Sequence, residues 1–319
     1  MVKRRSPTLE GFRIMFGRPL VGLAEIAWRW TFGMAAAAVL LFSLREYLAT
    51  LPVTAGEMLL LRTRQPVLVL QALAGIFQGS APRAVAAFVV LVLALGLAWI
   101  VIASLGRAAT LETLIEYCRG SRGRVRLTSL LVLNSLRAAT FLAATVGVVG
   151  ALLIARAASS PDDPSPGSVL LIFWTVAMLV GLAWLLLNWY LSLAAIFVVK
   201  DGASTFAALA AATDLCRSRP GSVAAAATWF GVAHTVMFVL ATSAAAFPLG
   251  FADVLPGGMV VGGLLLVTLL YFAVVDFLYV GRLAAYVFMI EPSSVTPQPQ
   301  SDDDILSDIP GLQTLTTEN

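Results

Sequence analysis

Long apolar runs, separated by short polar segments, dominate the pattern of this chain. A stretch of about 18 or more apolar residues is long enough to cross the hydrocarbon core of a bilayer as a helix. The runs therefore predict an all-α, polytopic membrane helical bundle with about six transmembrane helices. We place these spans at residues 26–48, 84–106, 128–155, 169–199, 223–247 and 259–288.

The composition agrees with this pattern, since 59% of the 319 residues are hydrophobic and only 12% are charged. Soluble domains are about 45–50% apolar and about 25% charged. The excess of apolar surface needs a non-aqueous solvent, so residues 1–290 are predicted to form one membrane domain. The remaining residues, 291–319, contain Pro297, Pro299 and an acidic run at 302–304, a composition typical of a disordered, solvated cytoplasmic tail.

Lysine and arginine residues are concentrated on one side of the predicted spans. They precede the first span and occupy the segments between the second and third spans and between the fourth and fifth. Because basic loops stay on the cytoplasmic side, both termini are predicted to be cytoplasmic. The residues on that side are Lys3, Arg4, Arg5, Arg13, Arg18, Arg107, Arg119, Arg122, Arg124, Arg126, Lys200, Arg217 and Arg219, against Arg62, Arg64, Arg83 and Arg156 on the other.

The segment between the first two spans, residues 50–82, is long and only partly polar. Its apolar residues, which include Met58, Leu61 and Leu70, predict an amphipathic helix that lies on the outer leaflet and is broken near Pro66. A re-entrant element over residues 55–78 is the alternative interpretation.

An internal repeat is indicated by two segments that lie 98 residues apart. Residues 111–119 and 209–217 share leucine, cysteine and arginine at matching positions, and each is followed by a basic turn and a predicted span. Residues 9–19 form a weaker third copy. The match predicts repeated units, each a surface helix followed by two spans; coincidence between Ala/Leu-rich sequences is the alternative.

The stretch Leu191–Gly202, followed by Phe206–Leu209 and Cys216–Pro220, resembles bacterial membrane proteins related to the membrane region of glycerophosphodiester phosphodiesterases. The resemblance implies a bacterial inner-membrane location and a layout of six spans. In the enzymes of that family, hydrolysis belongs to a separate soluble barrel that uses His and acidic metal ligands. This chain has a single His and no segment that fits such a barrel. The resemblance therefore implies a membrane module without implying hydrolysis.

Polar residues inside the predicted spans are the candidate functional residues. Asp276 lies in the sixth span, where a carboxylate at the centre of a lone helix costs about 2.5–3.5 kcal/mol to insert. Arg137 of the third span is its predicted partner, and a substrate or proton role for Asp276 is the alternative. His234, Asn134 and Asn188 are predicted to form hydrogen bonds between helices, each worth about 0.6 kcal/mol, with a proton relay as the alternative for His234.

An interfacial group is predicted at the start of the first span. Glu25 and Arg29 form an i,i+4 pair in the favourable order. Trp28 and Trp30 beside them are typical of the aromatic belt at a membrane surface.

Motifs of enzymatic chemistry are missing from the sequence, which has no P-loop, no His-Glu-x-x-His and no Cys-x-x-Cys. We therefore expect no catalytic residues, no metal and no cofactor, and no basic tract is long enough to suggest nucleic acid. The predicted function is a non-catalytic module that organises membrane lipids, a membrane-protein partner or further copies of itself. A transporter or permease for a small or amphipathic solute is the first alternative, and an intramembrane enzyme is the second.

Overall fold

The structure is a computed structural model that describes residues 6–17, 19–51, 53–63, 65–120, 123–158, 165–251 and 253–290. These residues form nine helices and no strand. The helices are α1 (Pro7–Gly17), α2 (Pro19–Ala49), α3 (Ala55–Arg62), α4 (Pro66–Arg119), α5 (Leu127–Ala157), α6 (Pro166–Asp201), α7 (Thr205–Ser218), α8 (Pro220–Gly250) and α9 (Gly257–Ile290). The predicted tail, residues 291–319, lies outside the described residues.

Six of the described helices, α2, α4, α5, α6, α8 and α9, are long and apolar enough to cross a membrane. The predicted all-α multi-pass membrane fold is therefore confirmed. Each helix extends past the apolar run that predicted it, because the flanking residues, many of them apolar, continue the helix. Pro19, Pro166 and Pro220 stand at first helical positions, where a missing N–H costs nothing.

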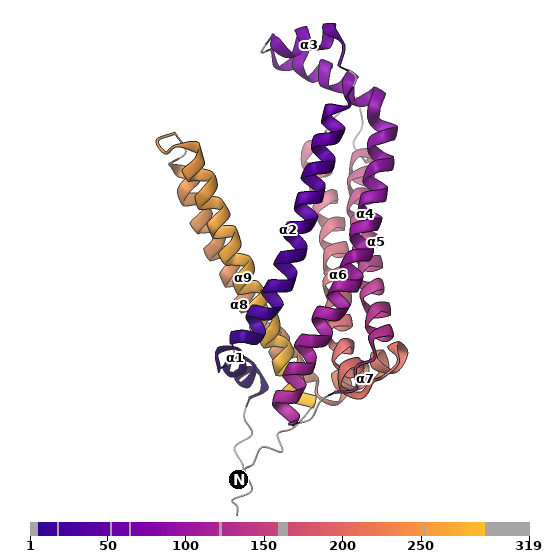
Figure 1. The fold of residues 1–319 in the computed structure, drawn as a ribbon, viewed down its shortest axis with the longest axis vertical. Coiled ribbons are helices and arrows are strands. Elements are labelled where there is room, and N and C mark those ends of the chain that lie inside the picture. The colour runs from indigo at the N-terminus through magenta and orange to yellow at the C-terminus, as the bar shows by residue number, and fades with distance from the viewer. Residues whose placement is uncertain are drawn as a thin grey trace, which may run out of the picture.

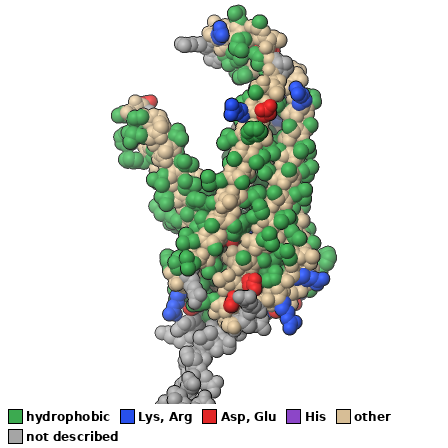
Figure 2. All heavy atoms as spheres, in the orientation of Figure 1, with side chains coloured by type: hydrophobic (Ala, Val, Ile, Leu, Met, Phe, Trp, Pro, Cys, Tyr) green, Lys and Arg blue, Asp and Glu red, His purple; other side chains and the backbone are tan. Residues whose placement is uncertain are grey.

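The spanning helices form two arms that meet at one end (Figure 1). One arm is the hairpin of α8 and α9, and the other contains α2, α4, α5 and α6. The short helices α1 and α7 lie at the end where the arms meet. Towards the other end the arms diverge and leave a deep notch with hydrophobic side chains on both of its sides (Figure 2).

The buried core lies where the arms meet. Its largest fully buried side chains include Leu111 and Ile115 of α4 and Tyr286 of α9. Helix α1 closes this core from one side, because Phe12 stacks on Phe230 of α8 with ring centroids 4.4 Å apart. Offset aromatic pairs of this kind are worth about 0.5–1.5 kcal/mol beyond their buried area.

The segment between the first two spans is broken as predicted, since α3 ends at Arg62 and α4 begins at Pro66. Helix α3 and the first part of α4 lie across the end of the bundle opposite α1 (Figure 1). The surface-lying and re-entrant interpretations of this segment both stay predictions. Pro82 lies inside α4, where an interior proline removes a backbone hydrogen bond and favours a kink.

A capping box fixes the start of α3. Glu57 Oε2 accepts from the backbone N–H of Thr54 at 2.8 Å and from its hydroxyl at 2.7 Å, and Glu57 N donates to Thr54 Oγ1 at 3.3 Å. These bonds favour the carboxylate and hold the pKa of Glu57 below its usual value of 4.5.

The lowered pKa of Glu57 predicts that α3 loosens in acid. A group with a depressed folded-state pKa stabilises fully above its unfolded pKa, and this stabilisation is lost as the pH falls through the folded value. Hydrogen exchange of the α3 amides, corrected for intrinsic rates, should show protection that falls below about pH 4.5. Glu57→Gln can still cap but cannot titrate, so its protection should not change with pH; an equal loss in that variant would contradict the assignment.

The expected surface helix at residues 111–119 is not a separate element, because α4 continues without a break to Arg119. The matching helix α7 is separate, since Gly202 ends α6 in the left-handed conformation with φ 65°. Ser104 occupies the position 98 residues before Gly202. Because a serine enters that conformation only at a cost, the first segment continues the span.

Candidate functional site

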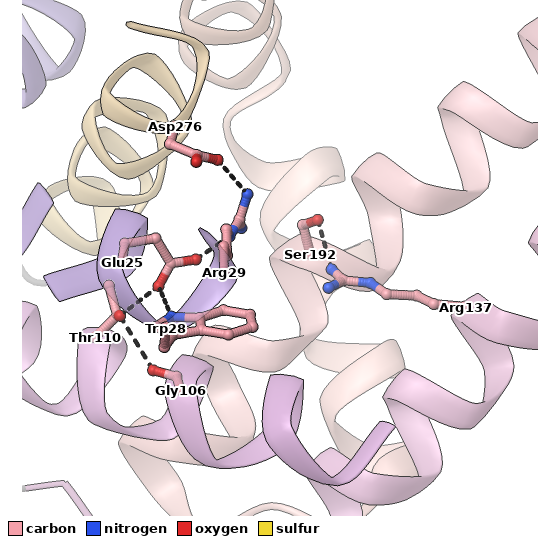
Figure 3. A network of polar contacts seen from close by, with 8 residues as sticks. All are labelled: Glu25, Trp28, Arg29, Gly106, Thr110, Arg137, Ser192 and Asp276. Atoms are coloured by element: carbon pink, nitrogen blue, oxygen red, sulfur yellow. Dashed lines mark hydrogen bonds and ion pairs between the residues drawn. The ribbon is translucent and has the colours of Figure 1, made fainter. Parts of the chain in front are cut away.

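Arg29 of α2 connects the two arms through its contact with Asp276 of α9 (Figure 3). From α2, its Nη1 donates to Asp276 Oδ1 of α9 at 2.6 Å, and its Nη2 lies 2.6 Å from Glu25 Oε1. The second contact is an ion pair by distance, although the N–H is not aimed at Oε1. Glu25 is 1% exposed and Asp276 is 7% exposed, so one guanidinium contacts two buried carboxylates and balances one of their two negative charges.

Glu25 also joins α2 to α4. Its Oε2 accepts from Trp28 Nε1 at 2.8 Å and from Thr110 Oγ1 of α4 at 2.6 Å. The indole of Trp28 lies against Gly106, where a Cβ would come within 2.5 Å of the ring. The interfacial group predicted from the sequence is therefore part of a buried network that connects α2, α4 and α9 (Figure 3), and the Trp30 side chain lies near Asp276 in the same network.

The predicted partner of Asp276, Arg137, lies elsewhere. Arg137 of α5 is buried and donates from Nη2 to Ser192 Oγ of α6 at 2.5 Å. Helix α5 packs against α4, α6 and α7, so its polar face meets that side of the bundle, whereas Asp276 faces α2. The expected Asp276–Arg137 pair is replaced by Asp276–Arg29 because similar depth along two spans does not make them neighbours.

The other polar candidates lie apart from this network. Asn134 of α5 donates from Nδ2 to Ser104 Oγ of α4 at 2.8 Å. Asn188 is half-buried, and its backbone carbonyl accepts from Ser192 Oγ at 2.8 Å. His234 is exposed on α8, with Nε2 3.3 Å from the hydroxyl of Tyr271 on α9. The structure therefore does not gather these residues into one site.

Three residues near Arg29 were not predicted from the sequence. The Cζ atoms of Arg29, Arg107 and Arg282 lie 4.4, 5.5 and 5.6 Å from the ring centroid of Tyr279 on α9. The sequence pattern places Arg107 in a basic cytoplasmic segment, but α4 continues through it and buries it to 6% exposure. One feature of the sequence could have indicated this convergence: each arginine lies a few helical turns from the same end of its span.

The described part of the chain shows no arrangement of side chains that favours metal binding or thiol chemistry. No three His, Cys, Asp or Glu residues gather there into a group that could hold a metal ion. Cys118 and Cys216 are free, and burial raises the pKa of the Cys216 thiol, which lowers its thiolate fraction at neutral pH. What the site offers chemically is a set of buried charges at the junction of three helices.

No family model, curated protein or solved structure matches this chain. The resemblance to the membrane region of glycerophosphodiester phosphodiesterases therefore stays a prediction, and a functional proposal has to be based on the geometry described above.

Proposed function

We propose that this protein is a non-catalytic, multi-pass protein of a bacterial inner membrane that holds and organises lipid between its two arms. The observation that supports the proposal is the apolar notch between the two arms (Figure 2). Both arms bear large exposed hydrophobic side chains, such as Leu40 and Leu41 of α2 and Leu266 and Phe272 of α9.

The notch favours lipid over water as its occupant. Apolar surface in contact with water costs about 25 cal/mol per Å² relative to an apolar environment. A spanning helix of 31 or 34 residues, as in α8 and α9, is about 45–50 Å long, so the arms reach across the whole hydrocarbon core. Acyl chains would fill the space between them with apolar contacts, and the notch would give those chains a defined position.

The orientation forms part of the proposal. Arg13, Arg124 and Lys200 belong to the end where the arms meet, and the positive-inside rule places such an end in the cytoplasm. The notch would then open towards the outer leaflet, and α1 and α7 would lie at the inner surface.

The buried network argues for a lipid-holding module over a solute transporter. A transporter needs polar groups that a solute or ion can reach from the membrane midplane. Here Glu25 and Asp276 are buried, and both are paired with Arg29. These carboxylates therefore support helix packing more directly than they support ion binding.

Native mass spectrometry of the full-length protein, extracted with its own lipid, tests the proposal. Lipid molecules held between the arms should remain at a fixed stoichiometry after bulk lipid has been stripped by detergent exchange. A bare protein, or one with a broad and variable number of adducts, would contradict the proposal. Solute uptake into proteoliposomes would then test the transporter alternative.

A further inference from the structure

Buried hydrogen-bond donors without acceptors gather around Tyr279 of α9, beside the Arg29–Asp276 contact. Arg107 is 6% exposed, and its Nε and Nη1 have no hydrogen-bond partner among the described residues. The same is true of Nε of Arg29 and Arg282 and of the Tyr279 hydroxyl. Because all three guanidinium groups lie within 5.6 Å of the Tyr279 ring centroid, these donors share one small region.

The region also has more positive charge than its carboxylates neutralise. It contains three arginines, and the two carboxylates, Glu25 and Asp276, both form ion pairs with Arg29. Among the described residues, neither Arg107 nor Arg282 forms an ion pair with a carboxylate. A buried cation without a counter-charge is strongly unfavourable. Buried polar groups almost always have a hydrogen-bond partner. We therefore expect the cluster to bind an anionic ligand with several acceptor oxygens.

The cluster lies level with the contact between α1 and α9. Helix α1, an amphipathic helix typical of a membrane surface, docks on α9 at Gly281 and Ala285. Arg282 lies at this level, and Asp276 lies six residues deeper, which is about 9 Å along the helix. The arms are joined by the Arg29–Asp276 contact and diverge towards the end opposite α1, so a headgroup at the cluster would direct its acyl chains into the notch.

We propose that Arg107, Arg282 and Tyr279 bind a phosphate group, supplied by a membrane lipid whose acyl chains lie in the notch. This inference rests on the proposed lipid-holding function. A phosphate presents several acceptor oxygens around one centre, and arginine binds it through charge-assisted hydrogen bonds. It would satisfy the unpartnered donors and neutralise the remaining positive charge.

Binding of two matched lipids to the purified full-length protein tests this assignment. Dioleoyl phosphatidylglycerol has a phosphate, and dioleoylglycerol has the same chains without one. After delipidation in detergent, the phosphate lipid should bind wild-type protein more tightly, and Arg107→Gln should weaken it by about tenfold to a hundredfold. Binding of dioleoylglycerol should be the same in both proteins. Arg217→Gln, which removes an exposed arginine of α7, is the matched control and should bind both lipids as wild type does.

Folding of the variant is checked by melting without lipid. Because the cluster has three arginines and two carboxylates, Arg107→Gln removes its one excess positive charge and should melt no lower than wild type in lipid-free detergent. Added phosphatidylglycerol should raise the melting temperature of wild type more than that of the variant. Arg282→Gln is a second variant at the less buried side of the cluster, and it should also weaken binding of the phosphate lipid.

The outcomes separate the two proposals. Equal binding of both lipids, unchanged by Arg107→Gln and Arg282→Gln, would overturn the phosphate site and leave the lipid-holding notch intact. If neither lipid binds, the proposed function fails. Melting with inorganic phosphate then tests whether the cluster binds phosphate at all. A melting temperature that inorganic phosphate raises in wild type but not in Arg107→Gln would support a site for free phosphate, and no such difference would overturn the site altogether.

Discussion

Replacing Arg29 with methionine is expected to destabilise the folded protein by about 3–5 kcal/mol, the usual cost of removing one partner from a buried ion pair. The substitution leaves Glu25, which is 1% exposed, and Asp276, which is 7% exposed, without their shared counter-charge. It also removes the Arg29–Asp276 hydrogen bond of 2.6 Å that joins the two arms. A large fall in melting temperature and in the yield of monodisperse protein should follow.

A compensated variant separates charge imbalance from a general packing defect. The triple variant Glu25→Gln, Arg29→Met and Asp276→Asn has no charge in this network, and the introduced glutamine would still offer an amide oxygen to Thr110 and Trp28. Replacing a whole buried ion set with neutral groups is often close to neutral, so the triple variant should recover most of the stability. Melting of the purified proteins in one detergent compares them. A triple variant no more stable than Arg29→Met would contradict the role assigned to the charges.

Replacing Gly11 with alanine is expected to release α1 from α9. A Cβ at Gly11 would lie 2.6 Å from the backbone oxygen of Gly281 and 2.8 Å from Cβ of Ala285. Neither atom belongs to the end of a flexible side chain, so one helix has to move. Overpacking of this kind costs about 1–3 kcal/mol, which outweighs the gain of up to about 1 kcal/mol in helix propensity.

Limited trypsin digestion measures this release, because Arg13 lies within α1 and should be cleaved faster once the helix has left α9. The Phe12–Phe230 stack would be lost as well, so the melting temperature should fall. Gly17→Ala is the matched control in the same helix, since no heavy atom lies within 4 Å of a Cβ at that position. Equal cleavage rates in Gly11→Ala and wild type would show that α1 is held by other contacts.

Features that depend on neighbours along the chain were predictable from the sequence. Six apolar runs gave six spanning helices, because a span is encoded by about 20 consecutive residues. The break before Pro66 follows from the lost N–H and fixed φ of proline. The proximity of Glu25 and Arg29 follows from one turn of helix. Each of these is a property of a single stretch of chain.

Contacts between helices were decided only by the tertiary structure. Asp276 had to pair with some cation, but its partner is Arg29, 247 residues away, and not Arg137, since α2 and not α5 lies against that face of α9. Arg107 is buried because α4 has no glycine at the position where Gly202 ends α6, and so continues as one helix. The convergence of three arginines on Tyr279 and the divergence of the two arms also result from contacts between helices that are distant in the sequence. Hydrophobic periodicity specifies that a helix forms, whereas the packing of side chains from distant segments determines which of its faces meet.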